Sequence, residues 1–127
     1  NLLHILTTNN IEYVTELKYF QNVTVISLYG NSLTSIDVSH NTKVTQLLLE
    51  DNQLTSLDVS ALSLLTDIKC HSNNLEEANI ANGNNSNMTR VEFQENRDLS
   101  CITVDDLGDV NASWLKDNTA VYSTNCN

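Results

Sequence analysis

Four side chains near the middle of the sequence could do acid–base or metal chemistry: Glu50, Asp51, Asp67 and His71. A cluster of carboxylates and an imidazole can bind zinc, or can supply a general acid and a general base. These residues lack the fixed spacing of a metal or catalytic motif, and the sequence has no glycine-rich phosphate loop, nucleophile elbow or paired-cysteine motif. A hydrolase-like or metal site around Glu50 and His71 is therefore a minor alternative, and we predict no enzyme activity and no cofactor.

The charge balance argues against two classes of partner. The sequence has 6 Lys and Arg against 16 Asp and Glu, which gives a formal net charge of -10. Nucleic acid and anionic membranes both bind basic surfaces, so neither is expected as a partner. No apolar run approaches the roughly 20 residues that cross a bilayer. The first residues do not form a signal segment, so we expect an excised or mature piece of a longer protein.

Any site must be positioned by an internal repeat, because residues 44–64 repeat residues 23–43 almost letter for letter. The aligned copies start near residues 1, 23, 44, 65 and 88. Each copy alternates apolar and variable residues twice, with the period of a β-strand. We therefore predict a stacked solenoid in a single domain, residues 1–127. Each unit should contribute one short parallel strand, and the opposite wall should be extended or irregular.

An asparagine recurs at the same place in every unit. Its amide can donate to and accept from the backbone of neighbouring turns where a strand ends, so we predict buried and fully bonded side chains. With only 3 glycines and no proline, the turns should be made by asparagine side chains rather than by special backbone angles. The predicted ladder consists of Asn9, Asn31, Asn52, Asn73 and Asn96.

Both ends of the chain depart from the repeat. Apolar residues recur every three positions across residues 12–20, which suits a helical turn or two. The repeat stops after Val104, and residues 105–127 should cover the exposed end of the core as a cap. Trp114 is the expected anchor of this cap, with a ligand-stacking role as the weaker alternative. The apolar residues of the cap are Leu107, Val110, Trp114 and Leu115.

The odd number of cysteines means that at least one is not in an internal disulfide. Cys70 stands where the preceding units have Leu28 and Leu49, so we predict a small buried residue. Cys101 and Cys126 lie outside the regular repeat and could close the C-terminal segment with a disulfide. Such a bond would place the protein in an oxidising compartment.

The repeat follows the pattern LxxLxLxxNxL, seen as VTVISLYGNSL, VTQLLLEDNQL and LTDIKCHSNNL. This pattern resembles that of leucine-rich repeats, and residues 9–31 look more like the repeat of internalin-type proteins. The resemblance implies an α/β-type, mostly β solenoid with a right-handed coil. Its concave parallel sheet should have about five short strands, with little helix outside residues 12–20 and the cap.

Residues 82–127 are similar to the C-terminal cap of secreted and cell-surface leucine-rich repeat proteins of Gram-negative bacteria. In those proteins the two cap cysteines are usually both present, which implies a disulfide between Cys101 and Cys126. The resemblance also implies a bacterial protein that is secreted or displayed on the cell surface.

The outward residues of the predicted concave sheet form rows of neighbours about 4.8 Å apart. The C-terminal part of these rows is charged, and we expect ion pairs of Asp67 with Arg90 and of Lys69 with Glu92 across adjacent strands. The predicted ligand-binding residues are Val25, Ser27, Tyr29, Gln46, Leu48, Glu50, Asp67, Lys69, His71, Arg90, Glu92 and Gln94.

The N-terminal part of the same rows is apolar. Leu3 and Ile5 should lie beside Val25, Leu48 and Tyr29. A contiguous exposed apolar patch on a solenoid marks a binding surface or the seat of a missing segment. If a preceding segment covers the first strand, three of these residues remain exposed.

The leading hypothesis is a non-catalytic, monomeric binding module. Its concave sheet would mediate adhesion or another interaction with a protein or glycan. The alternative is a structural spacer within a larger surface protein. The sequence names no ligand.

Overall fold

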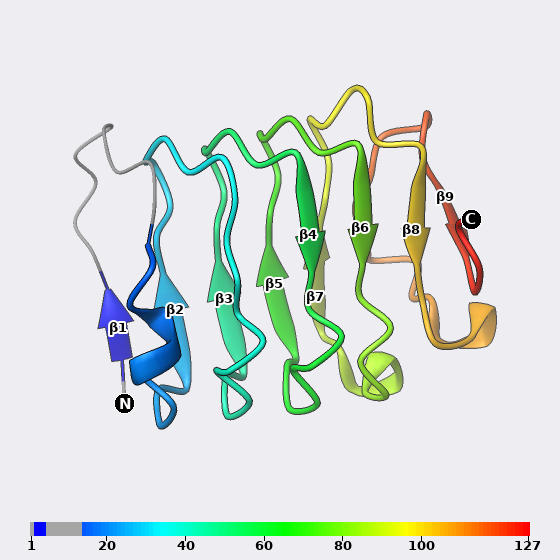
Figure 1. The fold of residues 1–127 in the computed structure, drawn as a ribbon. Coiled ribbons are helices and arrows are strands. Elements are labelled where there is room, and N and C mark those ends of the chain that lie inside the picture. The colour runs from blue at the N-terminus through cyan, green and yellow to red at the C-terminus, as the bar shows by residue number, and fades with distance from the viewer. Residues whose placement is uncertain (1, 5–13) are drawn as a thin grey trace.

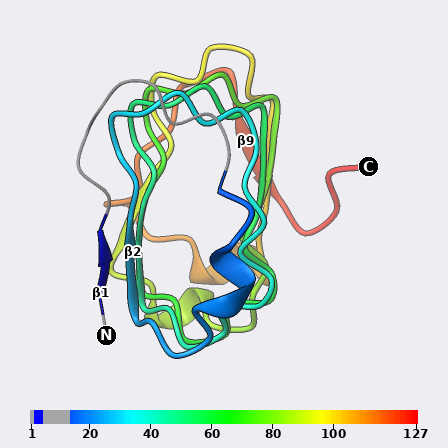
Figure 2. The same cartoon turned by 60° about the vertical axis from the view of Figure 1, so that its left-hand side comes forward.

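The computed structural model describes residues 2–4 and 14–127, which wind into a solenoid (Figure 1). Viewed obliquely toward the N-terminal end, successive coils overlay one another as closed loops with two long walls (Figure 2). Buried leucine, isoleucine and valine side chains fill the space between the walls. The predicted solenoid and its stacking are thus confirmed.

The first wall is a parallel sheet with the order β1-β2-β3-β5-β7. Each repeat unit contributes one strand of three residues. In four of these strands the central residue is buried in the core: Ile26, Leu47, Ile68 and Val91. This sheet corresponds to the predicted concave sheet. Its strands are β1 (Leu2–His4), β2 (Val25–Ser27), β3 (Gln46–Leu48), β5 (Asp67–Lys69) and β7 (Arg90–Glu92).

The register of β1 differs from the prediction by one residue. Leu2 pairs with Val25 and Leu3 pairs with Ile26. Because a one-residue shift exchanges the two faces of a strand, Leu3 packs against the core while Leu2 is 67% exposed. The expectation that Leu3 lies on the outer face is therefore wrong. The predicted outer residue Ile5 lies outside the described residues.

The second wall is more regular than predicted. It is a parallel sheet in the order β4-β6-β8-β9, with Leu57, Ala78 and Ile102 at the centres of the first three strands and buried against the core. The aligned segment of the preceding unit, residues 35–39, is not a strand. The strands are β4 (Ser56–Asp58), β6 (Glu77–Asn79), β8 (Cys101–Thr103) and β9 (Val121–Ser123).

Helical structure is limited to three single turns of 3-10 helix in the described residues: η1 (Leu17–Tyr19), η2 (Asn85–Asn87) and η3 (Leu107–Asp109). The predicted helix over residues 12–20 is shorter than expected, and residues 12 and 13 lie outside the described part. No helix in the described part of the chain is long and apolar enough to span a membrane.

Cys70 is fully buried and free, as predicted. It shares its layer of the core with Leu28, Leu49 and Phe93, which occupy the same place in the neighbouring coils. Burial, with a smaller contribution from the charge of Glu50, raises the pKa of the Cys70 thiol far above its ordinary value. The thiolate is the reactive form of cysteine, and the raised pKa keeps the Cys70 thiol protonated. Cys70 is therefore a packing residue.

The cap continues the coil rather than ending it. Leu115 forms an isolated parallel bridge with Glu92, and β9 pairs with β8. Trp114 is 6% exposed and packs edge-on against Tyr122, with ring centroids 5.8 Å apart, so the predicted anchor is confirmed. Burial raises the pKa of Tyr122 to about 12.

Two of the four apolar cap residues do not cover the core. Leu107 is 57% exposed and Leu115 is 46% exposed. Leu115 points outward because its backbone occupies a strand position beside β7, where its amide donates to the carbonyl oxygen of Val91 at 2.8 Å. Ala120 and Tyr122, which the sequence analysis did not assign to the cap core, contribute instead.

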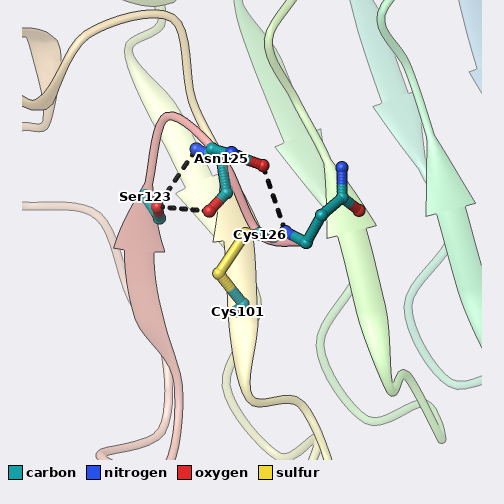
Figure 3. The surroundings of a disulfide bond; sticks show 5 residues. Cys101, Ser123, Asn125 and Cys126 are labelled. Atoms are coloured by element: carbon teal, nitrogen blue, oxygen red, sulfur yellow. Dashed lines mark hydrogen bonds between the residues drawn. A yellow bond between two sulfur atoms is a disulfide. The ribbon is translucent and has the colours of Figure 1, made fainter.

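A disulfide joins Cys101, the first residue of β8, to Cys126 (Figure 3). Its Cα atoms lie 5.8 Å apart, within the usual range for a disulfide. The pairing implied by the family resemblance is confirmed.

Candidate functional site

The candidate site is the outer surface of the five-stranded sheet together with the residues that directly follow its strands. We call this surface the five-stranded face. Its shape depends on the turns where each strand ends, because these turns fix the direction of Tyr29, Glu50, His71 and Gln94.

The asparagine ladder holds these turns together. Asn73 is 7% exposed, and its Nδ2 donates to the carbonyl oxygens of Leu49, Cys70 and His71 at 3.0 to 3.3 Å. Its Oδ1 accepts from the amide of Leu54 at 3.0 Å, so one side chain links two coils. Asn31, Asn52 and Asn96 are also buried and donate to strand-end carbonyls, while Asn9 lies outside the described residues.

Each of the four described ladder asparagines is preceded by a residue with positive φ, contrary to the prediction of turns without special backbone angles. The φ angles are 70° at Gly30, 58° at Asp51, 57° at Ser72 and 60° at Glu95. Only the first of these residues is glycine, which tolerates this conformation without a steric cost. The sequence contained a signal of this conformation, because Gly30 aligns with Asp51, Ser72 and Glu95 in the repeat.

A second ladder, of threonines, was missed at the start of the strands. Thr45, Thr66 and Thr89 donate their hydroxyl groups to the carbonyl oxygen of the equivalent threonine in the preceding coil, at 3.2 to 3.3 Å. Its signal was present in the sequence, because every unit from residue 23 onward has threonine as its second residue. The two ladders clamp strands β2, β3, β5 and β7 at both ends.

The structure brings the predicted outer residues onto one surface, but not all of them are accessible. Tyr29, 37% exposed, and Arg90 are the most open. Ser27, a small side chain between strands β1 and β3, is only 4% exposed, so little of its surface is open to a ligand. The remaining predicted residues are half-buried: Val25, Gln46, Leu48, Glu50, Asp67, Lys69, His71, Glu92 and Gln94.

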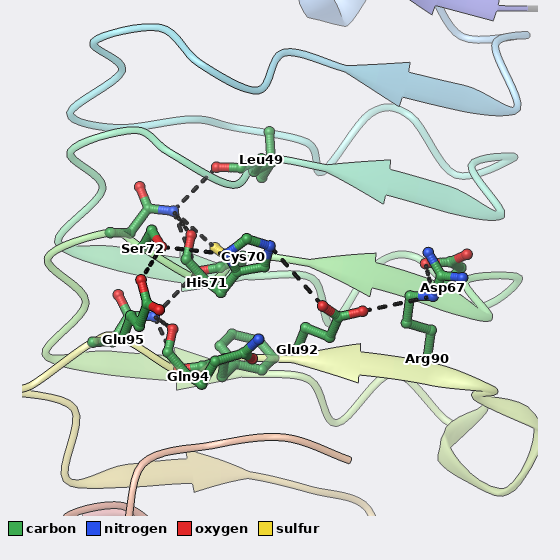
Figure 4. Close-up of polar contacts among 12 residues, drawn as sticks. Leu49, Asp67, Cys70, His71, Ser72, Arg90, Glu92, Gln94 and Glu95 are labelled. Atoms are coloured by element: carbon green, nitrogen blue, oxygen red, sulfur yellow. Dashed lines mark hydrogen bonds and ion pairs between the residues drawn. The ribbon is translucent and has the colours of Figure 1, made fainter. Parts of the chain in front are cut away.

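The charged part of the face is a small network around Glu92 and Arg90 (Figure 4). Arg90 Nε lies 3.9 Å from Asp67 Oδ1, which confirms one predicted ion pair, and 3.6 Å from Glu92 Oε2. The predicted pair of Lys69 with Glu92 is wrong: Glu92 Oε1 faces His71 Nε2 at 3.9 Å instead. Exposed ion pairs at such distances contribute about 0 to 1 kcal/mol each.

The surroundings of His71 do not resemble a hydrolytic centre. Its Nδ1 lies 3.3 Å from the hydroxyl oxygen of Ser72, but that hydroxyl donates to Glu95 Oε2 at 2.6 Å (Figure 4). The Ser72 proton is thus committed to a carboxylate rather than to the imidazole, the reverse of an activated serine. Within residues 2–4 and 14–127, no three His, Cys, Asp or Glu side chains are grouped to hold a metal ion.

Three oxygen atoms on the face are buried without a hydrogen-bond donor among the described residues. They are Glu50 Oε2, Asp67 Oδ1 and Gln94 Oε1, on the neighbouring third, fourth and fifth coils. Buried polar atoms are usually paired. The middle of the face is therefore richer in acceptors than in donors.

A solved structure of the functional domain of InlJ from Listeria monocytogenes, which includes a cysteine ladder, is similar to this chain. The TM-score is 0.63 and the sequence identity is 30%, over 81% of this chain and 24% of the Listeria chain. No family model and no curated protein matches the sequence. Since two of the three cysteines form the terminal disulfide, no cysteine ladder runs along this solenoid. The repeat motif, the stacked parallel strands and this similarity nevertheless identify the fold of the chain as a leucine-rich repeat solenoid.

Proposed function

We propose that the chain is a non-catalytic binding module of a secreted or cell-surface bacterial protein, and that its five-stranded face binds a protein or a glycan. The observation that carries the proposal is a group of apolar and aromatic side chains on strands β1 to β3 and just after β2. Leu2 and Tyr29 are exposed, and Val25 and Leu48 are half-buried beside them. Such a patch on a soluble, acidic molecule is a recognised mark of an interaction surface.

The polar part of the face supports the same proposal. Arg90 is exposed there and Glu92 is half-buried beside it, so a partner can contact both charges. About three outward residues on each of five strands fall short of the roughly 20 to 30 residues on each side of a standard interface. We therefore expect a weak or multivalent interaction.

The disulfide supports the proposed location. Disulfides persist in oxidising compartments and are rare in the cytosol. The spacer alternative differs in one testable respect, because a spacer needs no specific contacts on its five-stranded face.

The test is a binding screen of the purified chain against arrays of extracellular proteins and glycans, repeated with two variants. Tyr29→Ala combined with Leu48→Ala should weaken every specific interaction at least tenfold. The control is Val121→Ala, which removes a residue that is 58% exposed on the other sheet, and it should leave binding unchanged. If both variants bind like the parent, or if the parent binds nothing, the spacer alternative is favoured.

A further inference from the structure

The last four residues form a tail that leaves the solenoid after β9. In Figure 2 this tail lies outside the closed outline of the coils, on the side of the four-stranded sheet. The disulfide brings it back over β8, where Cys126 meets Cys101 (Figure 3). Both cysteines are half-buried, whereas Thr124, Asn125 and Asn127 are exposed.

Among the described residues, no hydrogen bond joins the tail to the sheet. Its hydrogen bonds all stay within residues 123–127: Ser123 Oγ donates to the carbonyl oxygen of Asn125 at 2.9 Å, and the amide of Asn127 donates to Asn125 Oδ1 at 3.2 Å. The amide of Asn125 donates to Ser123 Oγ at 3.1 Å. The disulfide is thus the one strong link between the tail and β8 in the described chain.

The tail encloses a cleft against the four-stranded sheet. The cleft has a volume of about 470 Å³. Its floor includes Ser56, Glu77 and Asn79 from β4 and β6, and its wall includes Thr124 and Asn127 from the tail. Removing the tail would open this cleft into a flat sheet surface.

We propose that residues 124–127 are a redox-released strap that covers the outer surface of β8 and β6 while the disulfide is closed. Reduction by a dithiol releases it. A dithiol thiolate attacks one sulfur of the disulfide, the other sulfur leaves as a thiolate, and the second thiol of the reductant then resolves the mixed disulfide. Two electrons and two protons pass to Cys101 and Cys126, and the reductant becomes a disulfide.

The rest of the cap stays in place because its contacts precede the strap. Trp114 packs against Tyr122, β9 pairs with β8, and Asp117 accepts from the amides of Glu95 and Asn96 at 2.9 and 2.8 Å. None of these contacts involves residues 124–127. Reduction should therefore change the four-stranded surface without dismantling the solenoid.

The experiment compares amide NMR spectra of the oxidised chain and of the chain reduced with dithiothreitol. We expect the order parameters of residues 124–127 to fall below about 0.6, the range of flexible backbone. Shift changes should be confined to the tail and to the outer surface of β6 and β8. Signals of Trp114 and Tyr122 should stay in their folded positions.

Two variants make the test independent of the reductant. Cys101→Ser and Cys126→Ser remove the same bond from opposite sides and should both give the spectrum of the reduced chain. A tail that stays rigid in these variants would show another anchor, and loss of the folded Trp114 signal would show that the disulfide holds the whole cap. Either result would overturn the proposal.

Discussion

Asparagine and aspartate side chains close turns on both walls of the solenoid, but they act in two different ways. Beside the five-stranded face, Asn52 and Asn73 are buried and bond to backbone groups of two coils. After the second wall, Asp37 and Asp58 are exposed, and each accepts a 2.9 Å bond from the amide two residues ahead. The ladder asparagines join coils, whereas the carboxylates of Asp37 and Asp58 only shape their own loops. Stability should therefore depend far more on the former.

The largest effect should come from breaking the ladder in the middle. Asn73→Ala leaves up to four backbone partners unsatisfied and should lower the free energy of unfolding by about 4 kcal/mol, since each such buried group costs roughly 1–3 kcal/mol. Urea denaturation measures the change. Asn74→Ala is the matched control, because Asn74 is exposed, and it should cost less than about 0.5 kcal/mol. Similar losses for the two variants would show that the buried ladder bonds of Asn73 contribute no special stability.

The next effect should appear where the ladder meets the cap. Asp117 takes the place of the next coil's backbone by accepting from the amides of Glu95 and Asn96. Asp117→Ala should cost about 2 kcal/mol, in the range for hydrogen bonds to a charged group. The same denaturation assay gives this value, and no loss would mean that water replaces the carboxylate without cost.

A smaller effect should follow from the backbone of the ladder turn. Gly30→Ala places a β-carbon on a residue with a φ of 70° and should cost about 1 kcal/mol. Its measurement is the shift of the thermal midpoint. An unchanged or higher midpoint would show that this turn relaxes, and that the positive φ of the equivalent residues carries little strain.

The smallest effect concerns the exposed turn at Asp37. The Ser39 hydroxyl, which donates at 2.6 Å, and the Ser39 amide lower the pKa of Asp37 below its ordinary value of 3.8. Its stabilisation is therefore present above pH 3.8 and is lost as the pH falls through the folded-state pKa. Ser39→Ala should raise this pKa, as followed by NMR titration, whereas Ser60→Ala should leave it unchanged. If the pKa of Asp37 is the same in the Ser39→Ala variant, the Ser39 hydroxyl is not what lowers it.

The repeat made most of the fold predictable. Residues that stay apolar in each copy, such as Leu28 and Leu49, must be buried for a reason that is common to all copies, and so must Cys70 at the same place. The asparagine ladder followed from the same alignment. The disulfide depended on the resemblance to known caps, because the sequence alone permits other states of Cys101 and Cys126.

Apart from the threonine ladder and the positive φ angles, the missed features depend on contacts that no repeat pattern encodes. Leu2 and Leu3 are both apolar, so alternation alone could not choose the register of β1. Ser27 is small and buried by its neighbouring strands, and Lys69 loses its expected partner because Glu92 reaches His71 and Arg90. The cap has no repeat motif, yet Leu115 and Tyr122 still continue both sheets. Such outcomes are set by tertiary neighbours rather than by local sequence.

Site-specific crosslinking tests the central claim most directly, namely that the five-stranded face is the binding surface. A photoreactive phenylalanine derivative replaces Tyr29 in one sample and Val121, on the opposite wall, in another. With any ligand that the screen identifies, the account predicts crosslinks from position 29 and none from position 121. Crosslinks from position 121 alone would contradict it and would place binding on the four-stranded sheet.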